Sequence, residues 1–331
     1  MSVAIAVPLF VAALAVTLTS AATFARRLDR LGAKYALPEV WIGLLTACAA
    51  DGPEVSSALV ALAKGAHDAS VGVIVGSNTF NLAAMIGVSA LVAGCVQVAR
   101  NTLVLEGTVA LAVTAIVIAL LLGWIAPVAA VLAVACFVAP YLLVVIGGER
   151  LAKRLGLRRL AALVKSRDGT EGEAEARGHL THEFVTHHQM VLMAIDMTLI
   201  VAGSFGMVQA ALTLGARWGI ASGVVGALIL GPLTSLPNAL TGIRLGRARR
   251  GAALVTEALN SNTINLVAGV ALPSLFVTLT TRSGKDQLDL ALLALAMVTT
   301  VALLAPRRGT GRTGAALIIA LYAAFVAATL S

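Results

Sequence analysis

Long apolar blocks dominate this sequence and restrict it to folds that cross a membrane. A helix needs about 20 apolar residues to span the hydrocarbon core of a bilayer, and ten blocks of roughly that length can be read along the chain. Charged residues make up only 12% of the chain, too few to cover a water-soluble globule with polar surface. The blocks are typical of helices and not of the short alternating strands of a membrane barrel. The expected spans are residues 3–24, 37–63, 71–97, 103–123, 126–147, 189–214, 220–246, 252–279, 287–305 and 313–330.

The distribution of Lys and Arg indicates how these spans are oriented. If the N-terminus lies outside, 20 of the 24 Lys and Arg fall in segments on the inner side of the membrane, as the positive-inside rule requires. The remaining four, outside, are Lys64, Arg217, Arg282 and Lys285. The pI near 10 therefore reflects topology and contact with anionic lipid, and not nucleic-acid binding. Because basic residues follow the first span and do not precede it, we expect a retained helix and not a signal peptide.

A polar interval divides the spans into two groups of five. We expect a first membrane half at residues 1–147, a cytoplasmic loop at 148–188 and a second membrane half at 189–331. The loop ends in a group of side chains that could bind a regulatory metal, although the absence of a fixed ligand spacing favours a solvated segment. This group consists of His179, His182, Glu183, His187 and His188.

The remaining reactive side chains give no sign of an enzyme. Cys48, Cys95 and Cys136 lie in apolar blocks without paired spacing, so we interpret them as small packing residues. No Ser/His/Asp set or zinc-ligand set falls within the spans. Glu106 lies at the end of a span, where we expect water to reach it, and Asp196 is expected near the inner interface in a structural role.

An internal repeat links the two halves. Pro53 and Pro237 each precede a polar G/N-S-N-x-x-N segment, and the residues Pro53, Ser77 and Asn81 recur 184 positions later as Pro237, Ser261 and Asn265. Under the expected topology, the two copies run through the membrane in opposite directions. The sequence therefore predicts an all-α polytopic membrane protein of ten transmembrane helices, arranged as two inverted five-helix repeats.

Oxygen-bearing side chains gather around this repeat. A proline within a span kinks the helix and frees backbone carbonyls, so each repeat places polar groups beside a kink. Carboxylate, amide and hydroxyl oxygens are the ligands that hard cations such as Ca²⁺ and Na⁺ prefer. The candidate ion-binding residues are Asp51, Glu54, Ser77, Asn78, Asn81, Thr234, Ser235, Asn238, Glu257, Ser261, Asn262 and Asn265.

The energetic penalty of buried charge favours function over packing for the three carboxylates. Each charged residue at mid-bilayer costs roughly 2.5–3.5 kcal/mol, and no Lys or Arg lies in these spans to pair with Asp51, Glu54 or Glu257. Such groups persist when they bind cations, line water or carry protons. The competing interpretation is a set of protonated carboxyl groups satisfied by neighbouring Ser and Asn, with the amides acting only as interhelical glue.

In these repeat regions the chain resembles the sodium/calcium exchanger superfamily of calcium:cation antiporters. The α-repeats of that family are similar to A-x-G-T-S-x-P-E on one helix and G-S-N-x-x-N on the next. The resemblance implies ten helices in two inverted halves and exchange of Ca²⁺ for Na⁺ or H⁺ by alternating access, with no cofactor. It also implies that the ion sites are lined by Glu54, Ser77, Asn81, Thr234, Ser235, Ser261 and Asn265.

The chain departs from the family pattern at charged positions. Ala50 and Asp51 replace the threonine and serine before the first proline, and one residue is missing between Gly43 and Pro53. In the second repeat, Asn238 replaces the family's glutamate. Glu257 stands where the family usually has an uncharged residue. These differences alter the charge of the site, which helps to set the ion that it accepts.

Two functions are compatible with these observations. The first is a secondary cation antiporter in which Glu54, Asp51, Asn81 and Asn265 hold the metal ion, with Glu257 as a supplementary ligand or proton carrier. The alternative is a paralogue that binds or senses ions without transporting them, since the second repeat lacks its glutamate. We expect small inorganic cations and the lipid bilayer as the partners, and a bacterial plasma membrane as the location.

Overall fold

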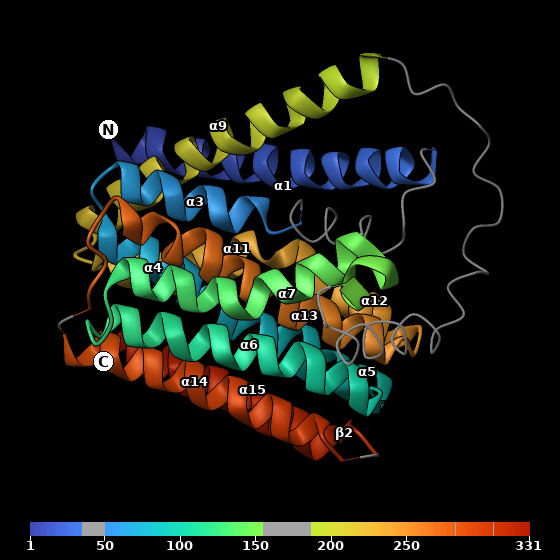
Figure 1. Cartoon of the computed structure of the whole chain (residues 1–331). Helices are drawn as coiled ribbons and strands as arrows, with labels where there is room; N and C mark the ends of the chain where they lie inside the picture. Colours follow the sequence, from blue (N-terminus) through green and yellow to red (C-terminus); the bar gives the residue numbers. More distant parts are fainter. Residues whose placement is uncertain (35–49, 155–186, 282, 307) are drawn as a thin grey trace.

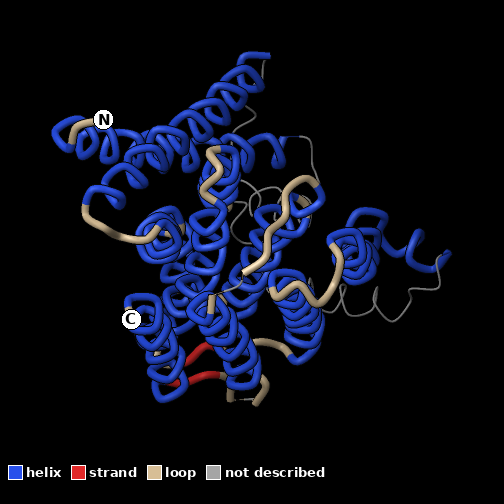
Figure 2. Tube along the Cα trace, turned by 90° about the vertical axis from the view of Figure 1, so that its left-hand side faces the viewer, coloured by secondary structure: helices blue, strands red, loops and turns tan. Residues whose placement is uncertain are grey.

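The computed structural model describes residues 1–34, 50–154, 187–281, 283–306 and 308–331, and within these ranges the chain is almost entirely helical. Figure 1 shows the helices lying roughly along one direction, with both termini at the same end of the bundle. Figure 2 views the bundle from that end. This confirms the expected membrane-type helical fold.

The helices follow the chain in two series. The first contains α1 (Val3–Lys34), α3 (Gly52–Ala63), α4 (His67–Asn81), the π-helix η1 (Leu82–Val88), α5 (Ser89–Ala93), α6 (Arg100–Leu121) and α7 (Pro127–Arg154). The second contains α9 (His187–Arg217), α10 (Ser222–Val224), the π-helix η3 (Val225–Leu230), α11 (Gly231–Thr234), α12 (Leu236–Arg247), α13 (Gly251–Leu266), the π-helix η4 (Val267–Ala271), the 3₁₀-helix η5 (Pro273–Leu275), α14 (Gly284–Leu304) and α15 (Arg312–Leu330).

The repeat predicted from the sequence is present in the helix boundaries. Helices α12, α13 and α14 begin at Leu236, Gly251 and Gly284, and each start lies 184 residues after the start of α3, α4 or α6. A π-helical segment directly follows both α4 and α13. The agreement over three helices and a rare local geometry shows that the two halves are copies of one structural unit.

Side-chain contacts show that the copies are inverted. Helix α13 and the η4 segment that follows it contact α4 with residue numbers that fall as those of α4 rise. Ile74 packs against Gly269, Asn78 accepts a hydrogen bond from Asn265, and Asn81 donates one to Ser261. The two equivalent helices therefore run antiparallel, as the prediction of inverted repeats requires.

Fewer than the expected ten spans can be identified within the described residues. Six helices within the described residues are long and apolar enough to cross a membrane, and the bent pair Ser222–Thr234 and Leu236–Arg247 makes a seventh. Residues Pro127–Leu143 form a shorter apolar helix. Residues 37–49 of the expected second span, and residues 155–186 of the expected loop with His179, His182 and Glu183, lie outside the described residues, while His187 and His188 begin α9. Helix α7 extends to Arg154, beyond the expected boundary at residue 147.

Glycines allow the two halves to pack closely at the centre of the bundle. A Cβ atom on Gly76 of α4 would lie 2.1 Å from the backbone oxygen of Ala227 in η3, and one on Gly226 would lie 2.3 Å from that of Ala69. Only a residue without a side chain fits between backbones at this distance. The close crossing fixes α4 against η3 and so holds the polar part of α4 in place.

Helices α1 and α9, the first helix of each half, lie side by side along one edge of the bundle (Figure 1). Asp196 of α9 accepts a hydrogen bond from Thr23 at 2.9 Å and forms an ion pair with Arg27 at 2.7 Å, both on α1. Asp196 therefore has the structural role predicted for it. Glu106 differs from its prediction, because it is only 2% exposed and accepts a hydrogen bond from Tyr141 of α7 at 3.4 Å.

A short ribbon joins two connections at the end of the bundle away from the termini (Figure 1). Strand β1 (Cys95–Val96) follows α5, and strand β2 (Thr310–Gly311) precedes α15. The two strands pair antiparallel, with Cys95 opposite Gly311. Cys95 is exposed and donates from its thiol to the backbone oxygen of Arg308 at 3.0 Å, so it lies in the ribbon and not in the helix packing that we expected.

Candidate ion-binding site

The site forms where a helix breaks in each repeat. Helices α3 and α12 both carry proline in their first turn, and the residues just before them, Asp51 and Ser235, have nearly the same backbone angles (φ −82°, ψ −4° and φ −83°, ψ 1°). In the second repeat the break bends the span by 47°. Proline removes a backbone donor at this point, so each break brings the side chains beside it into the interior of the bundle.

Asn238 is the centre of a hydrogen-bonded cluster that draws on both repeats. Its Nδ2 shares two hydrogens among three acceptors, Asp51 Oδ1 at 2.8 Å, Glu54 Oε1 at 3.1 Å and Ser261 Oγ at 3.1 Å. The Ser261 hydroxyl donates to the same Asp51 oxygen, and Asn81 Nδ2 donates to Ser261 Oγ at 3.1 Å. These five side chains are each exposed by 2% or less. The structure thus brings together five of the predicted site residues.

Several oxygens in and beside this cluster have no hydrogen-bond partner among the described residues. They include Asp51 Oδ2, Glu54 Oε2, Asn81 Oδ1 and Asn265 Oδ1, and also Ser235 Oγ and Asn262 Oδ1. Leaving a buried carboxylate oxygen unpaired is costly, and native structures rarely do so without a ligand, an ion or a water. Because the first four are acceptor oxygens on the residues predicted to hold a metal, two of them on carboxylates, the unsatisfied chemistry fits a cation.

Three asparagines join α4 to α13 in a symmetrical arrangement. Asn78 Nδ2 donates to the backbone oxygen of Asn262 at 3.1 Å, and Asn262 Nδ2 donates to that of Asn78 at 3.2 Å. Asn265 Nδ2 donates to Asn78 Oδ1 at 3.1 Å. The reciprocal pair places the pseudo-two-fold axis between these helices. It indicates that Asn78 and Asn262 clamp the crossing as well as contribute polar atoms to the interior.

The predicted hydroxyls lie at the breaks and within α4. Thr234 Oγ1 donates to the backbone oxygen of Leu230 at 2.9 Å, and Ser77 Oγ donates to that of Ile74 at 3.1 Å. Each hydroxyl therefore uses its proton within its own helix and keeps an oxygen lone pair. Ser235 lies beside the Glu54 carboxyl group. All three are fully buried.

Glu257 lies apart from the hydrogen-bonded cluster. Its side chain is half-buried, and no hydrogen bond joins it to the cluster among the described residues. It is close enough to feel the charge of Asp51, and it is one turn from Ser261 on α13. Ser57, one turn after Glu54 on α3, was not predicted, although its Oγ is fully buried and without a partner among the described residues. Its i+3 spacing from Glu54 was the available signal.

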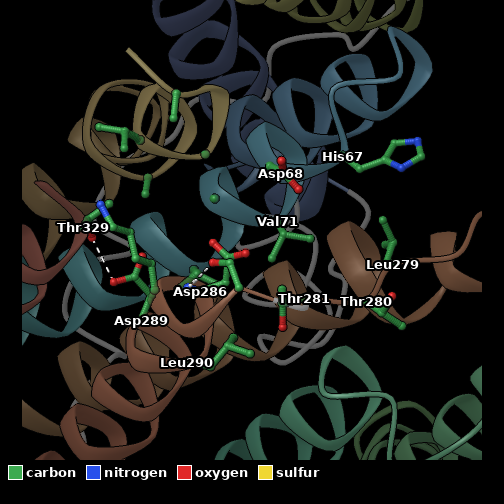
Figure 3. A pocket seen from close by; sticks show the side chains of 18 of the residues that line it. His67, Asp68, Val71, Leu279, Thr280, Thr281, Asp286, Asp289, Leu290 and Thr329 are labelled. Carbon is green, nitrogen blue, oxygen red and sulfur yellow. Dashed lines mark hydrogen bonds between the residues drawn. The ribbon is translucent and has the colours of Figure 1, made fainter. Parts of the chain in front are cut away.

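A cavity of about 350 Å³, shown from close by in Figure 3, is lined by residues that include Thr329 near the C-terminus. Its apolar wall includes Val71 and Val75 of α4, and Val75 lies two residues before Ser77. Asp68, Asp286 and Asp289 also line it, and Thr329 donates to Asp289 at 3.0 Å. The described residues contain no group of three or more acidic, His or Cys side chains able to hold a metal. The cavity, which Lys285 also lines, therefore places charged side chains near one end of α4 and holds no second metal-ligand set among the described residues.

A comparison with protein-family models matches residues 5–147 and 188–331 to the family described as sodium/calcium exchanger protein. The chain belongs to this family. The two matched segments correspond to the two repeat halves, and this membership makes the chain a multi-pass membrane protein of the cation-antiporter class.

Solved structures of an exchanger share the fold. The sodium-calcium exchanger NCX_Mj soaked with 10 mM Na⁺ and zero Ca²⁺ is 19% identical, with a TM-score of 0.61 and coverage of 98% of this chain and 99% of that one. The same exchanger soaked with 100 mM Na⁺ and 10 mM Sr²⁺ is 20% identical, with the same TM-score and coverage. A comparison with curated proteins finds no match. The exchanger fold of this family member is thus shared over nearly the whole chain.

Proposed function

We propose that this exchanger-family protein is a secondary antiporter that carries Ca²⁺ in exchange for Na⁺ or H⁺. The observation that carries the proposal is the pair of fully buried carboxylates, Asp51 and Glu54, each with one oxygen left without a partner among the described residues. Their combined charge of two would be balanced by one divalent cation or by two monovalent ones. A protein that exchanges one divalent cation for monovalent cations across the membrane is an antiporter.

The proposed ligands are the two carboxylates together with the amide oxygens of Asn81 and Asn265. Ca²⁺ takes about 6–8 oxygen ligands, so hydroxyls and backbone oxygens near the helix breaks complete the shell. The remaining candidates for this supporting role are Ser77, Asn78, Thr234, Ser235, Asn238, Ser261 and Asn262, while Glu257 serves as a supplementary ligand or proton carrier.

The buried ion pair elsewhere in the bundle supports a specific role for these acids. Asp196 is 6% exposed and has Arg27 as its partner. Asp51 and Glu54 have neither Lys nor Arg as a partner among the described residues, and only neutral donors reach them. An uncompensated charge in a low-dielectric interior costs several kcal/mol, and a transported cation is the natural compensation.

We further propose that the protein lies in a bacterial plasma membrane with both termini outside and the 148–188 loop in the cytoplasm. The loop then separates two membrane halves, residues 1–147 and 189–331. Both described termini lie at one end of the bundle, as an even number of crossings requires (Figure 1). Arg244, Arg247, Arg249 and Arg250 cluster at the opposite end, where the positive-inside rule expects the cytoplasm.

The test is Ca²⁺ uptake into proteoliposomes under an imposed Na⁺ gradient and, separately, an imposed H⁺ gradient. Glu54→Gln removes one charge without changing the size of the side chain, so uptake should be abolished. Asp196→Asn, which changes a buried acid outside the site, is the matched control and should retain uptake. Absence of gradient-driven flux for every alkali and divalent ion tried would refute the proposal. Tight ion binding without flux would instead favour the non-transporting alternative.

A further inference from the structure

Both central carboxylates lie at the start of α3, Asp51 just before the helix and Glu54 in its first turn, and the amide of Asn238 contacts both of them. Glu54 and Asn238 are equivalent positions of the two repeats, 184 residues apart, and they contact each other directly at 3.1 Å. Asp51 and Ser235 are likewise equivalent, with the same backbone angles before α3 and α12. The pseudo-two-fold axis therefore passes between these four side chains and divides the site into two half-sites.

Each half-site pairs one side chain from the break before or in the first turn of α3 with one from the second repeat. In the first half-site, the Glu54 carboxyl group lies beside Ser235. In the second, Asp51 Oδ1 accepts a hydrogen bond from Asn238 Nδ2 at 2.8 Å. Both half-sites thus contain one acid and one neutral side chain. The difference is that the acid occupies the position after the proline in the first half-site and the position before the proline in the second.

We propose that Asp51 supplies the acid that repeat symmetry would place at position 238, so that the charge of the second half-site can be moved between positions 51 and 238 without loss of cation binding. This inference rests on the proposed function. It states that residues 51 and 238 set the charge of the second half-site together, and that neither residue does so alone. One carboxylate in each half-site flanks a cation from both sides, an arrangement suited to a divalent ion.

Because Asp51 and Asn238 are in contact, the acid and the amide can be swapped between the two positions with little change in shape. Asp and Asn have the same shape, and the 2.8 Å bond joins a carboxylate oxygen to an amide nitrogen. Exchanging the two residues preserves that bond with its direction reversed, and it replaces the hydrogen bond from Asn238 to Glu54 by a contact between two carboxylates that a bound cation would bridge. It also preserves the total charge, the volume and the burial of both positions, since Asp51 is 0% and Asn238 is 1% exposed.

The experiment compares Ca²⁺ binding to purified wild-type protein, D51N, N238D and the D51N/N238D exchange by isothermal titration calorimetry. D51N leaves Glu54 as the one central carboxylate facing the ion, and we expect the affinity for Ca²⁺ to fall at least about 100-fold, because direct contact between a carboxylate and a divalent cation in a protein interior is worth that much or more. N238D concentrates three acids, so its thermal stability should depend steeply on Ca²⁺. The exchange variant should bind within about ten-fold of wild type.

The control and a second variant keep the result decisive. D196N changes a buried acid outside the site and should bind Ca²⁺ as wild type does. D51S/N238E gives the second half-site the same pair that Glu54 and Ser235 form in the first, and it should also bind Ca²⁺. It supplies the result if the D51N/N238D protein is poorly folded. The inference is overturned if wild type binds Ca²⁺ but neither double variant binds it more tightly than D51N does, when thermal unfolding shows that the double variant is folded. Failure of wild type to bind or transport any cation would instead overturn the proposed function.

Discussion

A single methyl group at the crossing of α4 and η3 should disable the protein. In Gly76→Ala, the new Cβ would lie 2.1 Å from the backbone oxygen of Ala227 and 2.6 Å from its Cα. Ordinary contact requires about 3.5 Å, so the two helices would have to separate by more than about 1 Å. Backbone atoms cannot rotate away as the end of a long side chain can, and the whole crossing must therefore open.

The expected cost follows from this separation. Overpacking a well-packed interior costs typically 1–3 kcal/mol, and the upper end applies here because both contacts are with backbone. Since Ser77 and Asn78 directly follow Gly76, the shift would also stretch the bonds between α4 and α13, which are already 3.1 Å long. We expect a loss of about 3 kcal/mol of stability and little or no Ca²⁺ uptake.

The assay is thermal unfolding of purified protein together with uptake into proteoliposomes. Gly284→Ala is the matched control, because a Cβ at the start of α14 meets nothing within 4 Å, and it should leave both measurements unchanged. A Gly76→Ala protein that melts with wild type and transports at the wild-type rate would refute the account of the crossing.

Two further results are expected from the bonds between helices. Asn262→Ala removes one bond of the reciprocal pair, while the Asn78 backbone oxygen keeps its bond from the Leu82 N–H, so stability should fall by about 0.5–1.5 kcal/mol in thermal unfolding; an unchanged melting temperature would contradict the clamp. Arg27→Met leaves Asp196 buried without its ion-pair partner and should destabilise the protein, and adding Asp196→Asn should recover most of the loss. A double variant as unstable as Arg27→Met would contradict the assignment of Asp196 as a structural acid.

Much of this architecture could be predicted because it depends on local patterns. Apolar length fixes membrane helices, and the constant offset of 184 residues between Pro53 and Pro237 revealed the repeat. The i,i+4 spacing of Ser77 and Asn81 placed both on one face of α4. Helix boundaries moved by several residues in places, since helix ends depend on contacts as well as composition.

The sequence did not predict which side chains of the site would form hydrogen bonds with one another. The pattern indicated that Asn238 and Asp51 belong to one site, but not that the amide would donate to both carboxylates. That outcome depends on the crossing angle and side-chain rotamers of helices far apart in the chain. The burial of Glu106 was missed for a similar reason, because its contact with Tyr141 of α7 is a tertiary one. The β1–β2 ribbon joins loops more than 200 residues apart and carried no signal of its own.

The reciprocal bonds between Asn78 and Asn262 mark an axis about which the two halves would interchange. In a transporter built on such an axis, the conformation open to one side of the membrane is the conformation open to the other with the roles of the repeats exchanged. Two identical repeats would make these conformations equal in energy. In such a transporter, residues that differ between the repeats, as Asp51 and Ser235 do here, would set the resting preference for one side.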